Sequence, residues 1–139
     1  MEKTYLALTE GRLPVAHGVV DAPIGRDPRH RKRMAVVPRG GREARTEYTV
    51  REFLANHTYA EARPITGRTH QIRVHFAAIG HPLVGDRVYG HRKQLLPVSR
   101  HFLHAAKLVL TLPSSGEPIE LLSELPDDLA ATLENLRQR

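Results

Sequence analysis

The chain carries, at residues 66–80, the stretch TGRTHQIRVHFAAIG, in which a polar loop leads into an apolar segment. Neither glycine nor proline occurs over Thr69–Ala78, and Ile72, Phe76 and Ile79 recur at helical spacing. Gly80 follows directly, at a position where glycine commonly ends a helix. The stretch therefore predicts a short helix over Thr69–Ala78.

Extended segments lie on both sides of this helix, and they alternate apolar and polar residues as half-buried strands do. In one of them, alternate residues would share a face, namely Ala44, Thr46, Tyr48 and Val50. The other candidates are the segments Tyr5–Leu8, Thr58–Ile65 and His101–Leu112, and a segment through Ile119 and Leu121. Strands in sequence with few helices predict an α+β fold with a mixed, mainly antiparallel sheet and a few short helices.

Turn-forming residues separate these segments. The pair Gly40-Gly41 predicts the turn of a β-hairpin, and Asn56-His57 and Pro113–Gly116 predict two further turns. A second helix is expected to begin near Pro126, because proline is tolerated in the first helical turn. The aspartates that follow favour the positive end of the helix dipole. Its apolar stripe predicts core packing and consists of Leu129, Leu133 and Leu136.

The composition describes one folded domain of 139 residues, with a net charge of +6 and an isoelectric point near 10.2. The absence of cysteine excludes disulfides and thiolate metal sites. No apolar run approaches the roughly 20 residues that span a bilayer. These features predict a cytoplasmic protein without membrane association. The excess of positive charge predicts a polyanionic partner, with nucleic acid as the leading class.

The positive charge gathers in residues 26–45, where Asp27 and Glu43 are the only acidic residues. Such a run can bind phosphate groups and release their counterions. Its prolines and glycines predict an irregular loop in contact with phosphates, and a solvated loop without function is the alternative. The residues expected to contact nucleic-acid phosphates are Arg26, Arg29, Arg31, Lys32 and Arg33.

The junction between loop and helix is a second candidate for anion binding, because a helix N-terminus presents unpaired N–H groups and partial positive charge. Arg68 and Arg73 lie five residues apart and cannot point the same way along a regular helix, so we expect them to serve different partners. The residues expected to bind a phosphate or another anion here are Arg68, Thr69, His70 and Gln71.

The same junction resembles the C-terminal conserved motif of the RluA-type RNA pseudouridine synthases. Further matches follow in the same order, upstream as KTYLAL at residues 3–8, PIGR at 23–26 and ARTEY at 44–48. Downstream they continue as GHPLVGDRVYG at residues 80–90 and LHA at 103–105. Because the matches are collinear and cover essentially the whole chain, residues 1–139 are identified as the C-terminal portion of such a catalytic domain.

The resemblance implies isomerisation of uridine to pseudouridine in ribosomal or transfer RNA, without a cofactor and without a metal. In this family an aspartate attacks the substrate nucleotide, and the uracil is detached, turned and rejoined through carbon. By motif position, Tyr5 resembles the tyrosine that stacks on the flipped base, and Arg73 resembles the arginine that pairs with the aspartate. A phenol offers a flat face and a hydroxyl, and a guanidinium keeps a carboxylate ionised.

The catalytic aspartate of the family belongs to a His-Arg-Leu-Asp segment, which is expected upstream of Lys3. None of the aspartates in this sequence has that context. Asp86 resembles a site-supporting element of the family rather than the nucleophile. The isolated chain is therefore expected to be inactive, with an exposed sheet edge and a tendency to aggregate. A non-catalytic RNA-binding remnant of the family is the alternative.

Nine histidines raise the question of a metal-dependent hydrolase. His70 and His75 are five residues apart and His101 and His104 are three apart, so neither pair has the spacing of a helical zinc motif. The sequence therefore gives little support to a metal site. His104, on an apolar strand, is predicted to be a hydrogen-bonded core residue. The tyrosines expected to serve in packing are Tyr48, Tyr59 and Tyr89.

Overall fold

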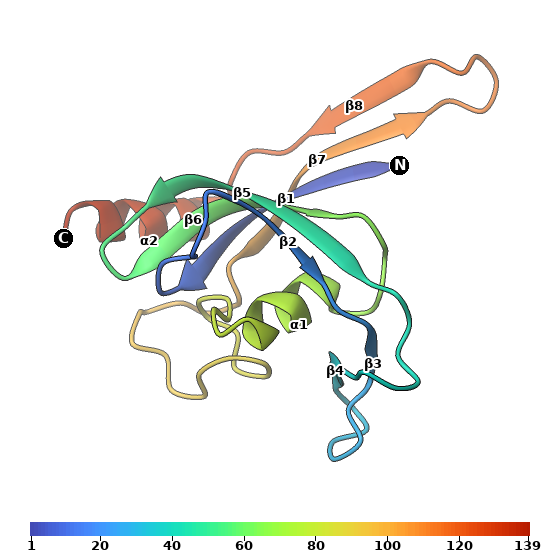
Figure 1. Cartoon of the computed structure of the whole chain (residues 1–139). Coiled ribbons are helices and arrows are strands. Elements are labelled where there is room, and N and C mark those ends of the chain that lie inside the picture. Colours follow the sequence, from blue (N-terminus) through green and yellow to red (C-terminus); the bar gives the residue numbers. More distant parts are fainter.

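A computed structural model describes all residues from Met1 to Arg139. The elements are, in order, β1 (Glu2–Glu10), β2 (His17–Asp21), β3 (Ile24–Arg26), β4 (Met34–Val36), β5 (Arg45–Phe53), β6 (His57–Pro64), α1 (Gln71–Ala78), β7 (Leu103–Thr111), β8 (Pro118–Leu122) and α2 (Asp127–Arg137). Six strands form one antiparallel sheet in the order β2-β5-β6-β1-β7-β8, and β3 pairs with β4 separately. The predicted α+β class is confirmed (Figure 1).

The inner strand β1 divides the core in two, because alternate side chains of a strand point to opposite faces. Leu6 and Leu8 belong to one buried cluster, together with the three leucines of α2 that were predicted to form a core stripe. Ala7 belongs to the other cluster, together with Ile72 and Phe76 of α1. The two helices therefore cover opposite faces of the sheet, and α1 lies beneath it in Figure 1.

Strands β3 and β4 form an arm that projects below the sheet in Figure 1. The arm and its tip hold all five basic residues expected to contact RNA in this segment. Asp27 shapes the tip, because its carboxylate accepts hydrogen bonds from the backbone N–H groups of Arg29 and His30. The base of the arm is anchored by Ile24, which is buried against Val74 of α1.

The hairpin predicted at Gly40-Gly41 is wrong. The strands on either side of this pair, β4 and β5, bond to different partners, since β4 pairs with β3 and β5 pairs with β2 and β6. Gly40 adopts a left-handed conformation in a turn, and Arg42 then bridges back to Ile24. The turn itself was predicted correctly, but it returns the chain to β3 instead of closing a hairpin.

The helix predicted over Thr69–Ala78 begins two residues later, at Gln71. His70 adopts a left-handed conformation, with φ of 55°, which cannot continue a right-handed helical turn. Gly80 ends the helix as predicted, with φ of 84° and a hydrogen bond from its N–H to the carbonyl of Ala77.

Strand β7 shows one further departure from the sequence-based prediction. His104 is hydrogen-bonded as predicted, with Nε2 3.1 Å from the carbonyl oxygen of Ser123, but it lies on a partly exposed strand and not in the core. Of the three tyrosines expected to pack, Tyr48 and Tyr59 are buried in the core and Tyr89 is half-buried. The core placement predicted for His104 was wrong because its side chain is turned toward Ser123, just after β8, and belongs to neither of the two large buried clusters.

The hairpin of β7 and β8 extends beyond the rest of the sheet (Figure 1). Strand β8 is the last strand of the sheet, and its Leu121 and Leu122 are 52% and 72% exposed. A shallow groove of about 350 Å³ runs along this surface from Tyr5 to Leu122. The sheet therefore has an exposed edge that carries apolar side chains.

Candidate active site

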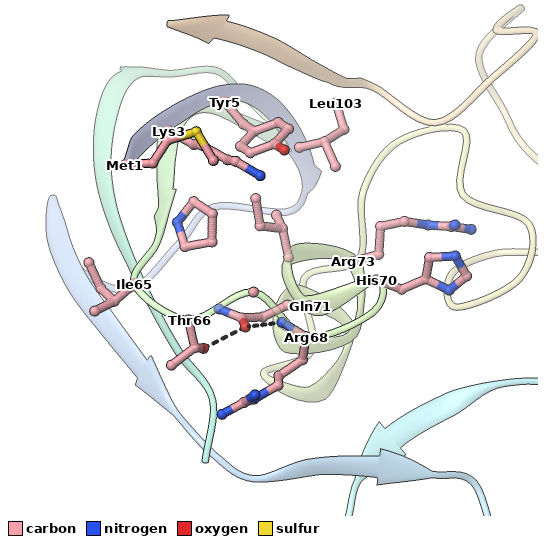
Figure 2. A pocket seen from close by; sticks show the side chains of 13 residues that line it. Met1, Lys3, Tyr5, Ile65, Thr66, Arg68, His70, Gln71, Arg73 and Leu103 are labelled. Atoms are coloured by element: carbon pink, nitrogen blue, oxygen red, sulfur yellow. Dashed lines mark hydrogen bonds between the residues drawn. The ribbon is translucent and has the colours of Figure 1, made fainter. Parts of the chain in front are cut away.

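A cavity of about 380 Å³ lies between β1, the loop after β6 and the start of α1. Figure 2 shows Tyr5 and Lys3 on one side of it, with Arg68 on the opposite side and Arg73 and His70 together at a third. The ring of Tyr5 is only half-buried, so part of an aromatic face remains accessible. The cavity thus combines an aromatic surface with several cationic side chains.

Arg73 reaches this cavity from α1 and is held by Asp86. Its Nε and one terminal nitrogen donate to the two carboxylate oxygens of Asp86, each at 2.9 Å. The side chain of Asp86 has no exposed surface and that of Arg73 is 13% exposed. The other terminal nitrogen of Arg73 makes no hydrogen bond within the chain. Arg73 is therefore fixed in direction and still has donors to offer.

The chain around Asp86 is built to hold an ionised carboxylate. Burial opposes its ionisation, but the hydrogen bonds from Arg73 and from the backbone N–H groups of Tyr89 and Val88 outweigh this effect and lower the pKa of Asp86. Gly85 must be glycine, because its φ is 83° and a Cβ there would collide with the carbonyl of Arg100. The carboxylate is a buried support, as the resemblance implied.

Arg68 and Arg73 serve different partners, as predicted. Arg68 leaves the loop in the opposite direction (Figure 2) and donates from Nε to the backbone carbonyl of Glu43 at 2.7 Å. It also lines a second groove of about 290 Å³, together with Arg26 and Arg42. Because Arg68 borders both hollows, it connects the cavity of Tyr5 with the base of the basic arm.

Gln71 lies beneath the loop and not on its surface. It is 4% exposed, and its carbonyl oxygen accepts hydrogen bonds from the hydroxyl of Thr66 and the backbone N–H of Arg68. Its amide nitrogen donates to the carbonyl of Arg45 and to the hydroxyl of Thr46. All its polar groups are used inside the protein, so the amide holds the loop in shape and is not free to contact a ligand.

The network continues from Gln71 into the core. The hydroxyl of Thr46 lies 2.8 Å from Nδ1 of His75, and Nε2 of His75 lies 2.9 Å from the carbonyl of Ala22. Burial lowers the pKa of His75, which is consistent with a neutral ring that donates on one side and accepts on the other. His75 therefore links the loop to the chain before β3.

Metal-ligating residues do not gather anywhere in the chain. No three side chains of histidine, aspartate or glutamate are close enough to hold an ion together. Neither helix has the length and apolar character needed to cross a membrane.

The chain matches the family of RNA pseudouridylate synthases over residues 1–78. It belongs to that family. A Chloroflexus aurantiacus protein described as an uncharacterized RNA pseudouridine synthase is 52% identical over 139 residues, which are all of this chain and 43% of that protein. The ribosomal large subunit pseudouridine synthase D of Nitrosomonas europaea is 49% identical over 99% of this chain and 41% of its own length.

A solved structure supports the same family. Human RNA pseudouridylate synthase domain containing 1 superposes with a TM-score of 0.76 at 28% identity, over 99% of this chain and 66% of that structure. The resemblance to RluA-type synthases noted in the sequence is thereby confirmed. This member of the family spans less than half the length of the two bacterial relatives that it matches.

The family match includes both residues predicted to be catalytic, and the structure brings them to one cavity although β1 and α1 are far apart in sequence. Of the residues expected to bind RNA, Arg68, His70 and the largely buried Gln71 also line this cavity, while Arg26 and Thr69 line the neighbouring groove. The arm residues Arg29, Arg31, Lys32 and Arg33 border neither.

Two residues at this site were not predicted from the sequence. Lys3 lines the cavity beside Tyr5, and the hydroxyl of Tyr89 contacts His70. Lys3 lies within a motif used to recognise the family, and its position at the cavity depends on the loop after β6 and the start of α1, which are distant in the sequence. Tyr89 follows Asp86 by three residues, a spacing that carries no signal for a polar contact across the fold.

Proposed function

We propose that this chain forms part of an RNA pseudouridine synthase that converts uridine to pseudouridine in RNA. The reaction is an isomerisation: the bond from the sugar to a ring nitrogen breaks, a bond from the sugar to a ring carbon forms, and the proton lost from that carbon is replaced by one at nitrogen. No oxidant, cofactor or metal is required for this balance. Tyr5 is the stacking residue, and Arg73 orients the catalytic carboxylate.

One observation carries the proposal, namely that Tyr5 and Arg73 line the same cavity of about 380 Å³. This volume is within the range of pockets that enclose small ligands. A base rotated out of an RNA helix needs an aromatic or apolar surface against which to stack, and Tyr5 offers one. The surrounding cations suit the phosphates on either side of such a nucleotide.

The nucleophile in this proposal is an aspartate from a segment that precedes the chain in the complete protein. Asp86 is unsuited to attack a nucleotide, because it is buried and both its oxygens are engaged by Arg73. Arg73 retains an unused terminal nitrogen, which can donate to a second carboxylate. The isolated chain is therefore expected to lack activity.

The basic arm and the groove beside it provide the proposed path for RNA. Arg26, Arg42 and Arg68 line this groove, and Arg68 continues into the cavity. The name of the Nitrosomonas europaea relative refers to the large ribosomal subunit, which makes ribosomal RNA the first substrate to test for this chain, with transfer RNA as the second. A cytoplasmic location follows from such a substrate.

The test compares the chain alone with a fusion that adds the segment preceding the matched region in the Chloroflexus aurantiacus relative. Each protein is incubated with ribosomal RNA, and pseudouridine is measured by mass spectrometry of nucleosides. We expect no product from the chain alone and product from the fusion. In the fusion, Tyr5→Leu should abolish product because it removes the aromatic face for stacking. Arg73→Lys should also abolish product, because lysine cannot form the bidentate contact with a carboxylate. Asp128→Asn, on the surface, is the control.

A non-catalytic RNA-binding remnant is the alternative, and the arm with its groove would suit it equally well. A folded fusion that binds RNA but forms no pseudouridine would support the remnant. Activity of the isolated chain would refute the proposed position of the nucleophile.

A further inference from the structure

Tyr89 is in contact with three separate parts of the molecule. Its ring lies beneath the guanidinium of Arg73, with 4.9 Å between Cζ and the ring centroid. Its hydroxyl accepts a hydrogen bond from the backbone N–H of Met34 in β4 at 3.1 Å and lies 2.8 Å from Nδ1 of His70. Tyr89 thus joins the basic arm, the start of α1 and the pair of Arg73 with Asp86.

The two contacts of the Tyr89 hydroxyl favour one tautomer of His70. A backbone N–H can only donate, so the phenol oxygen accepts from Met34, and its own proton is available for Nδ1 of His70. When the phenol donates this proton to Nδ1, the neutral ring carries its own proton on Nε2. Burial and, after it, the charge of Arg73 lower the pKa of His70, which favours the neutral ring.

The backbone of His70 is strained in a way that serves this contact. It is the only residue other than glycine with a positive φ, and its side chain does not cap α1. A left-handed conformation in a residue with a side chain costs free energy and persists where the surroundings enforce it, often at functional positions. Here it directs the imidazole toward Tyr89, with the two rings in an edge-to-face arrangement at 5.6 Å.

We propose that Tyr89 is a positioning residue, which fixes His70 as the tautomer protonated on Nε2 and presents that N–H group to an acceptor oxygen of the bound RNA. His70 is exposed at the edge of the cavity, with its imidazole directed away from Tyr5 (Figure 2), so the ring is accessible to RNA that extends beyond the cavity. The same hydroxyl also accepts a hydrogen bond from Met34 of β4. A movement of the arm on RNA binding would therefore change the hydrogen bond between Tyr89 and His70. The inference rests on the proposed RNA-binding function.

Nuclear magnetic resonance of the 139-residue chain tests the contact directly, because the nitrogen shifts of an imidazole report its tautomer. Asn tolerates the left-handed conformation, so His70→Asn identifies the signals of His70 by their loss. Tyr89→Phe keeps the ring under Arg73 and removes the hydroxyl. Tyr48→Phe is the matched control, because the ring of Tyr48 packs on Phe76 and burial alone raises the pKa of its hydroxyl.

In the unmodified chain and in Tyr48→Phe, we expect the proton of His70 on Nε2. In Tyr89→Phe, we expect a mixture of tautomers and a rise in the pKa of His70, because the hydrogen bond that favours the neutral ring is lost. The charged or titratable groups that act on His70 are Arg73, Asp86 and His101, and all three remain in every variant. Unchanged His70 signals in Tyr89→Phe would overturn the proposal.

A binding experiment tests the role toward RNA, with a single-stranded oligonucleotide that contains uridine as the probe. Tyr89→Phe should weaken binding about fivefold, the effect of one ordinary hydrogen bond. In the background of His70→Asn, the same substitution should have no further effect, because Tyr89 acts through His70. Additive losses would overturn the positioning role.

The two proposals fail in different ways. If neither the unmodified chain nor the fusion binds RNA, the proposed function and the contact of His70 with RNA are both refuted. The nuclear magnetic resonance experiment still shows, in that case, whether Tyr89 determines the tautomer of His70. If RNA binds and the tautomer is unaffected by Tyr89→Phe, only the inference about Tyr89 is refuted.

Discussion

Asp86→Asn is the substitution whose effect on stability the structure predicts most directly. Oδ1 of Asp86 accepts from Arg73 and from the backbone N–H groups of Val88 and Tyr89, whereas Oδ2 accepts only from Nε of Arg73. An asparagine would therefore keep its oxygen at the first position and place its NH₂ group against Nε of Arg73. One hydrogen bond becomes a repulsive donor–donor contact, and the guanidinium loses its counter-charge.

The magnitude follows from the burial of the pair. Removing one partner of a buried ion pair typically costs about 3–5 kcal/mol. Arg73 keeps 13% of its side chain exposed, so water can offset part of the loss, and we expect the lower end, about 3 kcal/mol. For a domain of this size, such a loss lowers Tm by about 10 °C.

A second arginine provides a matched control. Arg100 binds Asp128 with the same geometry, from Nε and one terminal nitrogen at 2.9 Å each, but both side chains are about half exposed. Asp128→Asn should therefore lower the unfolding free energy much less than Asp86→Asn, because water screens the pair and the exposed carboxylate loses only a weak interaction with the dipole of α2. Urea denaturation followed by circular dichroism measures both variants under identical conditions.

The pH dependence adds an independent check on the same pair. The pKa of Asp86 is lowered in the folded protein, so its contribution to stability is fully present above about 3.9, the value of an unfolded aspartate. The contribution is lost as the pH falls below that value toward the lowered pKa. The stability gap between the unmodified protein and Asp86→Asn should therefore narrow at acidic pH. Equal losses for Asp86→Asn and Asp128→Asn at pH 7 would refute the reasoning from burial.

Three further predictions concern other parts of the chain. Replacing Arg26, Arg42 and Arg68 together by alanine should lower the slope of log affinity for single-stranded RNA against log salt concentration by up to about 2, measured by filter binding. Gln71→Ala should reduce the unfolding free energy by about 2 kcal/mol in urea denaturation, because it leaves buried partners without hydrogen bonds. Leu122→Thr should reduce self-association in light scattering without lowering Tm, because it removes exposed apolar surface from an edge strand.

The sequence predicted those helices and strands well in which apolar residues recur at a regular spacing. The alternation in β5 and the leucine stripe of α2 depend only on spacing, and both are confirmed. Strand β2 was missed because it is short and buries a single residue, Val20. The arm of β3 and β4 was read as a loop because three-residue strands carry no periodicity.

The site was harder to predict, because its geometry depends on contacts between distant segments. The family resemblance identified Tyr5 and Arg73, but periodicity could not show that they share a cavity. The pairing of Arg73 with Asp86 depends on the turns at Gly80 and Gly85, which reverse the chain between them. The helix start predicts Gln71 as an anion-binding residue, whereas its burial depends on contacts with Arg45 and Thr46, which are distant in the sequence.

Asp86 and the proposed catalytic aspartate would share one guanidinium, and their roles differ because their surroundings differ. Asp86 is enclosed and cannot move toward a substrate, so its effect is to hold Arg73 in one orientation before any ligand arrives. A planar guanidinium held on one edge loses little further freedom when its other edge binds a second carboxylate. The buried pair would thus lower the entropic cost of aligning the nucleophile, which gives a structural carboxylate an indirect part in the chemistry.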